Sequence, residues 1–398
     1  MKPGPILRLI HIAALLLGLA GAVSWAAAPE THQIDPEAAL QAIIADIRDN
    51  RLDAALTKTD ALLDLLPNFR LAHLIRGDLL LARVRPLDSV GSVDGVSAAT
   101  LADLRDEAFA RLRARSERPA DGLLPRSLLR LSTDQQHAVV VDTSRSRLYV
   151  FRNDRGLPRL VADYYVSQGK EGSEKWREGD KRTPIGVYFV TSSIPAAELP
   201  EFYGSGAFPI NYPNEWDRRL GRDGYGIWLH GSPPDTYARP PRASDGCVVL
   251  ANQDLDALSG FVTPGQTPVV IGNTIDWVPA ARWLNERKAL ERHLETWRRD
   301  WESRDVVRYL AHYAADFRSD DVDRAGWESQ RRRIIADKTW LRVRLSNLSM
   351  FRSPGREDLI VVSFDQHFES DTLNSTLRKR QYWIQREGRW QIAYEGQA

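Results

Sequence analysis

The sequence predicts a multidomain protein in which an N-terminal α-helical module, a β-rich module and a C-terminal α+β module follow one another. Its 398 residues exceed the roughly 100–200 residues of a usual domain. Apolar residues recur with helical spacing over residues 36–83 and again over 281–318. Between and after these stretches, short β-branched and aromatic runs alternate with turn residues, as strands do.

The N-terminal module is expected to contain helices joined by short turns. Residues 36–83 hold three apolar-periodic segments, separated at Asn50 and Pro67. A loop over 84–97 and a further helix over 98–116 follow. A single unit of this kind, which has the rhythm of a tetratricopeptide repeat, cannot bury its own apolar face. We therefore expect it to dock on another domain or on a second subunit.

From about Gln136 the hydrophobic period changes to that of strands. The strands are expected near 138–142, 147–152, 160–167, 226–229 and 267–273. Residues 196–222 read as a loop because prolines and glycines interrupt them. After the helical stretch over 281–318, four alternating segments predict antiparallel strands, an order typical of an α+β domain. A curved sheet wrapped round helices would form a cone with a pocket.

The first residues have the features of a secretory signal. Lys2 and Arg8 flank an apolar run from Leu9 to Val23, and the small residues Ala26–Ala28 follow it. The run is shorter than the roughly 20 residues of a membrane-spanning helix. Residues 1–28 are therefore predicted to be a cleaved signal peptide, the alternative being an uncleaved anchor. The mature protein is expected to be exported, and periplasmic in a Gram-negative host.

Charge and histidine spacing argue against several partners and cofactors. With 54 basic and 53 acidic residues, the chain has no strongly basic field, which makes nucleic acid a poor candidate partner. The histidines show no spacing typical of a metal-ligand cluster. We expect neither a metal nor an organic cofactor.

Cys247 is the single cysteine of the chain. It has no partner for an internal disulfide. In an exported protein, such a thiol is a buried apolar residue, an intermolecular link or a reactive nucleophile. The neighbouring sequence decides among these, because a cysteine nucleophile needs a base to form the thiolate near neutral pH.

A histidine–glycine pair stands before Cys247. His230 ends a predicted strand, and the loop that follows is long enough to fold back and bring the imidazole to the thiol. The carbonyl of Gly231 can accept the other ring proton and so select the tautomer. Gly246 lets the backbone approach a substrate, and its N–H with that of Cys247 can hold an oxyanion. A histidine–glycine pair after a strand is also common in ordinary turns.

These residues form a recognisable pattern. His230-Gly231, the run Ser244-Asp245-Gly246-Cys247-Val248 and the upstream segment KRTPIGVY together resemble the L,D-transpeptidase catalytic domain, or YkuD domain, over residues 136–275. The resemblance implies a β-rich fold acting on peptidoglycan stem peptides. Cys247 would attack the bond between residue three and D-alanine four, His230 would be the base, and Gly231 would orient it.

The chain departs from the family pattern at two positions. The family commonly has histidine at the position of Asp245, and arginine or asparagine at the position of Val249. Neither position supplies the nucleophile or the base, so the departures bear on the acyl acceptor. The acceptor is expected to be an amine, including a lipoprotein lysine, with water as the alternative. Further candidates around the nucleophile, each with a purely structural alternative, are Tyr212, Arg239, Arg242, Ser244, Asp245 and Gly246.

The flanking modules extend the resemblance. Residues 281–398 are similar to the nuclear-transport-factor-2-like (NTF2-like) fold, and residues 29–118 form the helical module. This order resembles that of cell-shape-determining L,D-carboxypeptidases. It implies a homodimer through the helical module, with simple coverage of the catalytic domain as the alternative, and a glycan or protein ligand for the C-terminal domain. A rival from another class is a non-catalytic wall-binding scaffold.

Overall fold

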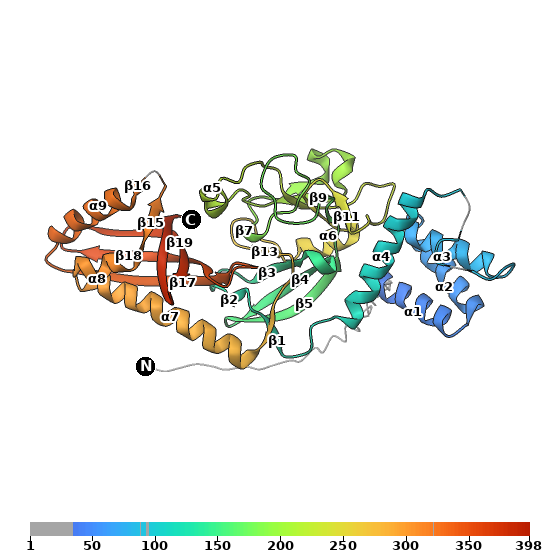
Figure 1. The fold of residues 1–398 in the computed structure, drawn as a ribbon, viewed down its shortest axis with the longest axis horizontal. Helices are drawn as coiled ribbons and strands as arrows, with labels where there is room; N and C mark the ends of the chain where they lie inside the picture. Colours follow the sequence, from blue (N-terminus) through green and yellow to red (C-terminus); the bar gives the residue numbers. More distant parts are fainter. Residues whose placement is uncertain (1–34, 88, 93–94, 321) are drawn as a thin grey trace, which may run out of the picture.

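The computed structural model describes residues 35–87, 89–92, 95–320 and 322–398. The predicted signal peptide lies outside this part of the chain. The molecule is elongated, with the helical module at one end, the β-rich domain in the middle and the C-terminal domain at the other end (Figure 1). Within the described ranges, no helix combines the length and the hydrophobicity needed to cross a membrane.

The helical module has the four helices that the sequence predicts. They are α1 (Pro36–Arg48), α2 (Leu52–Leu65), α3 (Arg70–Leu81) and α4 (Ala98–Ser116). The side chains of Asp35 and Ser97 accept backbone N–H groups at the starts of α1 and α4, as N-caps do. Asn50 has a positive φ of 58° in the turn after α1, a conformation that asparagine tolerates.

Two sheets form the β-rich domain. The first has the order β5-β4-β3-β13-β7, and the second has the order β12-β10-β9-β8. The strands of the first are β3 (His137–Asp142), β4 (Arg147–Asp154), β5 (Leu157–Tyr165), β7 (Gly186–Phe189) and β13 (Pro268–Gly272). Those of the second are β8 (Ile194–Pro195), β9 (Gly206–Pro209), β10 (Trp228–His230) and β12 (Val248–Val249).

One apolar core joins these two sheets. Val139 and Val150 of the first sheet pack in the same cluster as Leu229 and Val248 of the second. A small ladder and short helical segments complete the domain: β6 (Gln168–Gly169), β11 (Arg242–Ser244), α6 (Asn252–Ser259), and the 3-10 turns Thr143–Arg145, Ala196–Glu198 and Glu201–Tyr203.

The expectation of a loop over residues 196–222 is wrong in part, because β9 and the short helix α5 (Glu215–Arg219) lie within it. Asn214 and Asp217 form a reciprocal capping box that starts α5. The spacing of this pair is visible in the sequence. Five residues are too few to show helical periodicity, so the surrounding prolines and glycines dominated the prediction.

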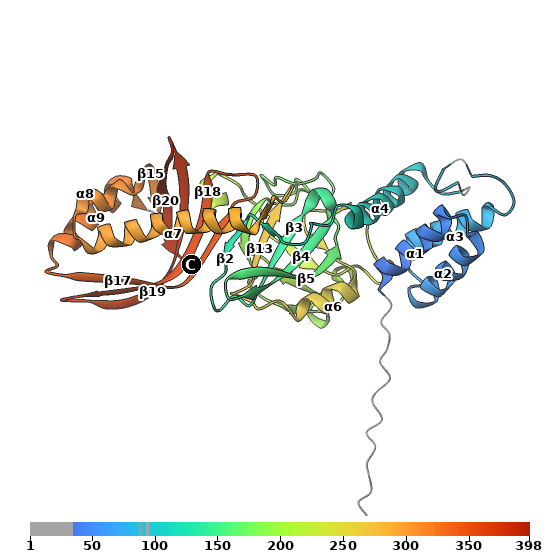
Figure 2. The same cartoon turned by 90° about the horizontal axis from the view of Figure 1, so that it is seen from below.

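The C-terminal domain is a curved sheet with helices on one side, seen edge-on in Figure 2. The sheet has the order β16-β15-β20-β19-β18-β17-β2. Its strands are β2 (Leu128–Arg130), β15 (Tyr313–Ser319), β16 (Val322–Asp323), β17 (Leu341–Arg352), β18 (Leu359–Ser370), β19 (Asn374–Arg386) and β20 (Arg389–Gln397). The helices are α7 (Ala280–Glu302), α8 (Val306–Ala311) and α9 (Arg324–Ala336).

The helical expectation over residues 281–318 is wrong at its C-terminal end. Arg304 has a positive φ of 61°, which breaks the helix, and the Asp305 side chain caps α8. From Tyr313 the chain pairs with Ile392 of β20 as a strand. The four predicted strands are present as β17 to β20, whereas α9 is a helix that the sequence analysis missed.

Aromatic side chains fill the interior that was expected to hold a pocket. The buried rings between the sheet and the helices include Trp297, Trp301, Tyr309, Tyr313, Phe317, Trp327 and Phe364. The hydroxyl of Tyr313 donates to the buried carboxylate of Glu395 at 3.1 Å. The interior of this domain is therefore a packed core.

The β-rich and C-terminal domains share apolar packing and a strand. Val140 and Phe189 of the central sheet lie in one cluster with Phe351 and Tyr382 of the C-terminal sheet. The segment before the central domain supplies β2, which pairs with β17, while β1 (Leu123–Pro125) pairs with β14 (Trp277–Pro279). These contacts hold the two domains as one body.

Candidate active site

Strand pairing brings the predicted base and nucleophile together. β10 and β12 run parallel, with Leu229 opposite Val248 and His230 opposite Val249. Cys247 directly precedes Val248 and therefore stands beside Trp228. Because side chains alternate along a strand, Cys247 and His230 fall on the same face of this sheet, offset by one pleat.

His230 is held as a neutral base. Its side chain is 1% exposed, and Nδ1 lies 2.7 Å from the carbonyl oxygen of Gly231. Because a carbonyl only accepts, Nδ1 carries the proton and the lone pair is on Nε2. Burial lowers the pKa of His230 to about 4, so the imidazole is neutral at physiological pH.

Cys247 is a protonated thiol in the resting site. It is partly exposed, and its Sγ donates to the carbonyl of Gly226 at 3.4 Å. Desolvation by the surrounding protein raises the pKa of this thiol to about 11, although the charge of Arg239 lowers it. The resting pair is a neutral thiol and a neutral imidazole, so the proton must move during attack.

The turn before Cys247 is fixed by hydrogen bonds. The Ser244 hydroxyl donates to the Cys247 carbonyl at 2.6 Å and accepts the N–H of Gly246 at 3.1 Å. Gly246 has a φ of 129°, and a Cβ there would lie 2.8 Å from the carbonyl oxygen of Arg182. The predicted oxyanion role of the Gly246 N–H is wrong, because this N–H is bound to Ser244. The Cys247 N–H stays the candidate donor to the oxyanion.

Three other predicted residues make their contacts outside the thiol–imidazole pair, although the charge of Asp245 raises the pKa of the Cys247 thiol. Tyr212 is 5% exposed in the core, and its hydroxyl donates to the carbonyl of Asp223 at 2.9 Å, which agrees with the structural alternative for this residue. Asp245 is exposed and pairs with Lys170 at 3.1 Å. Arg242 is exposed at the start of β11.

Arg239, by contrast, stands beside the thiol and the imidazole. Its charge lowers the pKa of both Cys247 and His230. The guanidinium carbon lies 4.4 Å from the centre of the Phe202 ring, a cation–π geometry. The site therefore has a cation next to the nucleophile, as binding of a substrate carboxylate requires.

Aromatic residues that the sequence analysis missed line the base. The ring of Tyr203 meets the His230 ring edge-on at 5.0 Å, and Phe202 lies 6.0 Å from it. Trp228 is partly buried and packs on Tyr203 at 4.9 Å. These aromatic side chains form one wall of the site.

Asn252 is a second residue that the sequence analysis missed. Its Oδ1 accepts the N–H groups of Ser205 and Ser232, each at 3.0 Å. A Cβ on Gly231 would lie 2.1 Å from that oxygen, so the close approach needs glycine. Asn252 thereby ties the segment carrying Tyr203 to the segment that follows His230. Only the tertiary fold brings these three segments together.

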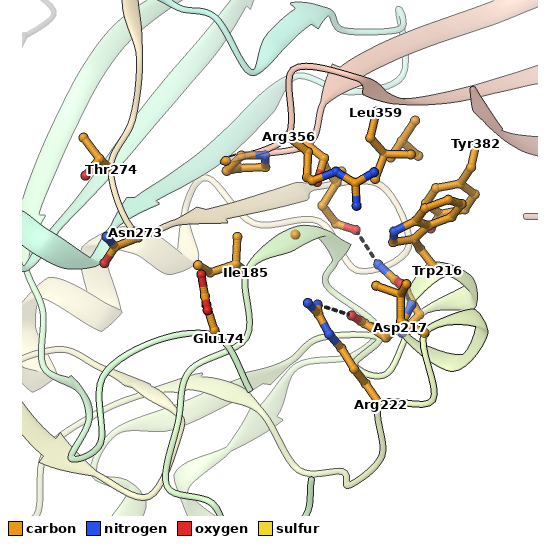
Figure 3. Close-up of a pocket in the computed structure, with 18 of the residues that line it drawn as sticks. Glu174, Ile185, Trp216, Asp217, Arg222, Asn273, Thr274, Arg356, Leu359 and Tyr382 are labelled. Atoms are coloured by element: carbon orange, nitrogen blue, oxygen red, sulfur yellow. Dashed lines mark hydrogen bonds and ion pairs between the residues drawn. The ribbon is translucent and has the colours of Figure 1, made fainter. Parts of the chain in front are cut away.

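A cavity of about 390 Å³ lies elsewhere, at the junction with the C-terminal domain. Figure 3 shows Arg222 pointing toward Asp217 on one side, Trp216 and Tyr382 on another, and Arg356 above. Cys247 and His230 do not line it. Among the described side chains, no group of three or more His, Cys, Asp or Glu is placed to hold a metal ion.

Comparison with known proteins identifies two domains. Residues 136–271 match the model of the L,D-transpeptidase catalytic domain (YkuD), and residues 289–396 match that of the Cds6 C-terminal NTF2-like domain. Two curated Escherichia coli relatives, both described as putative L,D-transpeptidase YafK, are 28% identical over 127 residues. That alignment covers 29% of this chain, which spans about half, 46%, of the length of each relative.

Solved structures resemble more of the chain. Bd1075 of Bdellovibrio bacteriovorus has a TM-score of 0.63 at 28% identity, covering 69% of this chain and 98% of that one. The helical cell shape determining protein Pgp2 of Campylobacter jejuni has a TM-score of 0.58 at 23% identity, over 73% of this chain and 98% of its own, which shows a shared fold. The chain therefore carries an L,D-transpeptidase catalytic domain of the YkuD type, followed by an NTF2-like domain.

Proposed function

We propose that this protein is an exported cysteine acyltransferase that cleaves the bond between residue three and D-alanine four of peptidoglycan tetrapeptide stems. The observation that carries the proposal is the Cys247–His230 pair on one sheet face, with Nδ1 of the imidazole bound to Gly231, inside a domain that matches the L,D-transpeptidase family. Arg239 is assigned to the stem-peptide carboxylate.

In the proposed acylation, Cys247 is the nucleophile and His230 the base. Sγ of Cys247 attacks the carbonyl carbon of residue three while its proton passes to Nε2 of His230. The tetrahedral intermediate collapses as Nε2 returns that proton to the D-alanine nitrogen. The carbon–nitrogen bond breaks, D-alanine leaves, and a thioester on Cys247 remains. The hydrogen bond from Nδ1 to Gly231 stabilises the imidazolium between these steps.

Deacylation reverses the roles of the same residues. His230 takes a proton from the acceptor as it attacks the thioester, and the Cys247 thiol is regenerated. An amine acceptor gives a cross-link or an attached protein. Water is the second candidate acceptor, because the buried Val249 lies opposite His230 and offers no polar group to hold an amine. Water would make the enzyme a carboxypeptidase.

The cellular role proposed is modification of the wall in a way that affects cell shape. Support comes from the fold shared with the helical cell shape determining protein Pgp2. Export through residues 1–28 would place the enzyme in the compartment where its substrate lies. Dimerisation through the helical module, and a glycan or protein ligand for the C-terminal domain, remain expectations of the same resemblance.

Mass spectrometry of the purified chain from residue 29 mixed with disaccharide-tetrapeptide tests the proposal. We expect loss of D-alanine and a transient adduct on Cys247, with neither in Cys247→Ser. Dimeric products would establish transpeptidation, and tripeptide alone would establish water as the acceptor. If the wild-type protein gives neither product while still binding cell walls, the scaffold alternative replaces the enzyme.

A further inference from the structure

The helical module packs directly on the loop between His230 and Cys247. The side chain of Asn68 donates to the carbonyl of Pro234 at 3.0 Å, and the backbone carbonyl of Asn68 accepts the N–H of Tyr237 at 3.1 Å. The ring of Tyr237 lies 4.6 Å from that of Phe69. Residues of the helices and of this loop share one apolar cluster. The module therefore holds the loop through its backbone as well as through its side chains.

A buried arginine of α4 lies at the centre of this contact. Arg111 is 3% exposed, and its Nε donates to Glu107 at 2.9 Å. It also pairs with Glu37 of α1. Its guanidinium carbon lies 3.9 Å from the centre of the Tyr165 ring, at the end of β5. Burying an arginine is costly unless its charge is paired, so this arrangement fixes the guanidinium plane against Tyr165.

Tyr165 continues the contact to the active site. The tyrosine is 3% exposed, and its hydroxyl donates to the backbone carbonyl of Arg239 at 2.9 Å. Arg239 in turn lies over Phe202 and acts electrostatically on Cys247. Asp235, an acidic residue of the same loop, is paired with Arg70 of α3 at 2.8 Å. That pairing directs the Asp235 carboxylate to the helical module.

We propose that Arg111 and Tyr165 are positioning residues, through which the helical module sets the place of the Arg239 guanidinium beside the nucleophile. The helical module would thus help to position the cation that binds an anion at this site. This inference rests on the proposed function only for the identity of the anion, the stem-peptide carboxylate. The position of Arg239 relative to Cys247 can be measured without any peptidoglycan substrate.

The single cysteine makes that measurement direct. Iodoacetate and iodoacetamide alkylate the same thiol, but only iodoacetate carries a carboxylate that a neighbouring cation attracts. The ratio of their rates with the full mature chain, at low ionic strength and one alkaline pH, reports the charges that act on Cys247, which are Lys175 and Asp245 as well as the Arg239 cation. Arg239→Met defines the ratio without that cation, and the iodoacetamide rate controls for thiol access.

We expect Tyr165→Phe to lower the ratio by about threefold toward the Arg239→Met value, the effect of losing one hydrogen bond. The double variant Glu107→Gln with Arg111→Met removes the buried Glu107–Arg111 pair, while Glu37, the other partner of Arg111, keeps Arg147 at 4.0 Å. It should lower the ratio similarly. Tyr164→Phe removes a hydroxyl from the adjacent residue of β5 and should keep the wild-type ratio. Circular dichroism confirms that each variant is folded.

A wild-type ratio in folded Tyr165→Phe and in the double variant overturns the proposal. An unchanged ratio in Arg239→Met also overturns it, because Arg239 would then not act at the thiol. Failure of the tetrapeptide to acylate Cys247 bears on the proposed function alone and leaves this test intact.

Discussion

At the scale of single residues, a glycine carbonyl and burial together hold His230 as a neutral imidazole, the form that the proposed general base requires. The bond from Nδ1 to Gly231 orients the ring, and burial lowers the pKa so that the neutral form dominates. The same desolvation raises the pKa of Cys247. In the proposed mechanism, attack by the Cys247 thiol and proton transfer to His230 are therefore coupled. Loss of the base should then lower the acylation rate.

His230→Gln should lower the acylation rate by about 10²–10⁴-fold, the usual contribution of a general base. Its melting temperature should stay near that of the wild type. Stopped-flow or intact-mass measurement of the thioester checks this, with His137→Gln, a partly buried histidine of β3, as the matched control. Normal thioester formation in His230→Gln would mean that another group takes the proton.

The pH dependence of acylation follows from the two pKa values. Below about pH 4 the imidazole is protonated and cannot accept a proton, so the rate falls there as pH decreases. Above that pH the rate should form a plateau, because the thiol, with a pKa of about 11, stays protonated through the neutral range. Alkylation by iodoacetamide, which needs the thiolate, should instead rise toward pH 11. A rate of acylation that climbs between pH 5 and 8 would contradict the neutral-pair mechanism.

At the scale of elements, turns and a cross-link shape the site around β10 and β12. Gly246→Ala places a methyl group 2.8 Å from a backbone carbonyl at a φ of 129°. We expect a loss of about 1–3 kcal/mol in the free energy of unfolding and a strongly reduced acylation rate. Urea denaturation and intact-mass assays measure both. Gly265→Ala, at a φ of 77° with open space around it, should cost stability without affecting acylation.

The Asn252 cross-link gives a second prediction at this scale. Asn252→Ala leaves two backbone N–H groups without their acceptor and should lower the free energy of unfolding by about 1–3 kcal/mol, with slower acylation. Asn252→Asp keeps the accepting oxygen and should retain most of the stability. Equal losses in the free energy of unfolding of the two variants would show that stability does not depend on the accepting oxygen.

At the scale of the whole molecule, the catalytic and C-terminal domains share one core, so they should unfold together. Phe351→Ala removes a buried ring that lies 6.0 Å from Phe189 across the junction. We expect a loss of about 3–5 kcal/mol and a single, earlier calorimetric transition for both domains. Phe109→Ala, at a ring that is 64% exposed on α4, should change stability by less than about 0.5 kcal/mol. Two separate transitions after Phe351→Ala would mean that the domains are independent.

The sequence alone was sufficient where the determining signal is local. Apolar periodicity predicted α1 to α3 and the four long strands of the C-terminal sheet, because each of these elements has one face against a core. The His230-Gly231 and Gly246-Cys247 motifs located the candidate catalytic pair through their resemblance to the L,D-transpeptidase pattern, and the close packing of Gly231 and Gly246 explains why glycine stands at these two positions.

Tertiary structure decided what depends on contacts between distant segments. Nothing near Tyr165 indicates that its hydroxyl holds Arg239, or that Arg111 lies over its ring. Nothing near Tyr212 distinguished a buried core tyrosine from a groove residue. The aromatic filling of the C-terminal domain also became evident only once its sheet and helices were assembled. Local periodicity records which face of an element is buried, but which side chains then meet is set by packing among segments far apart in the chain.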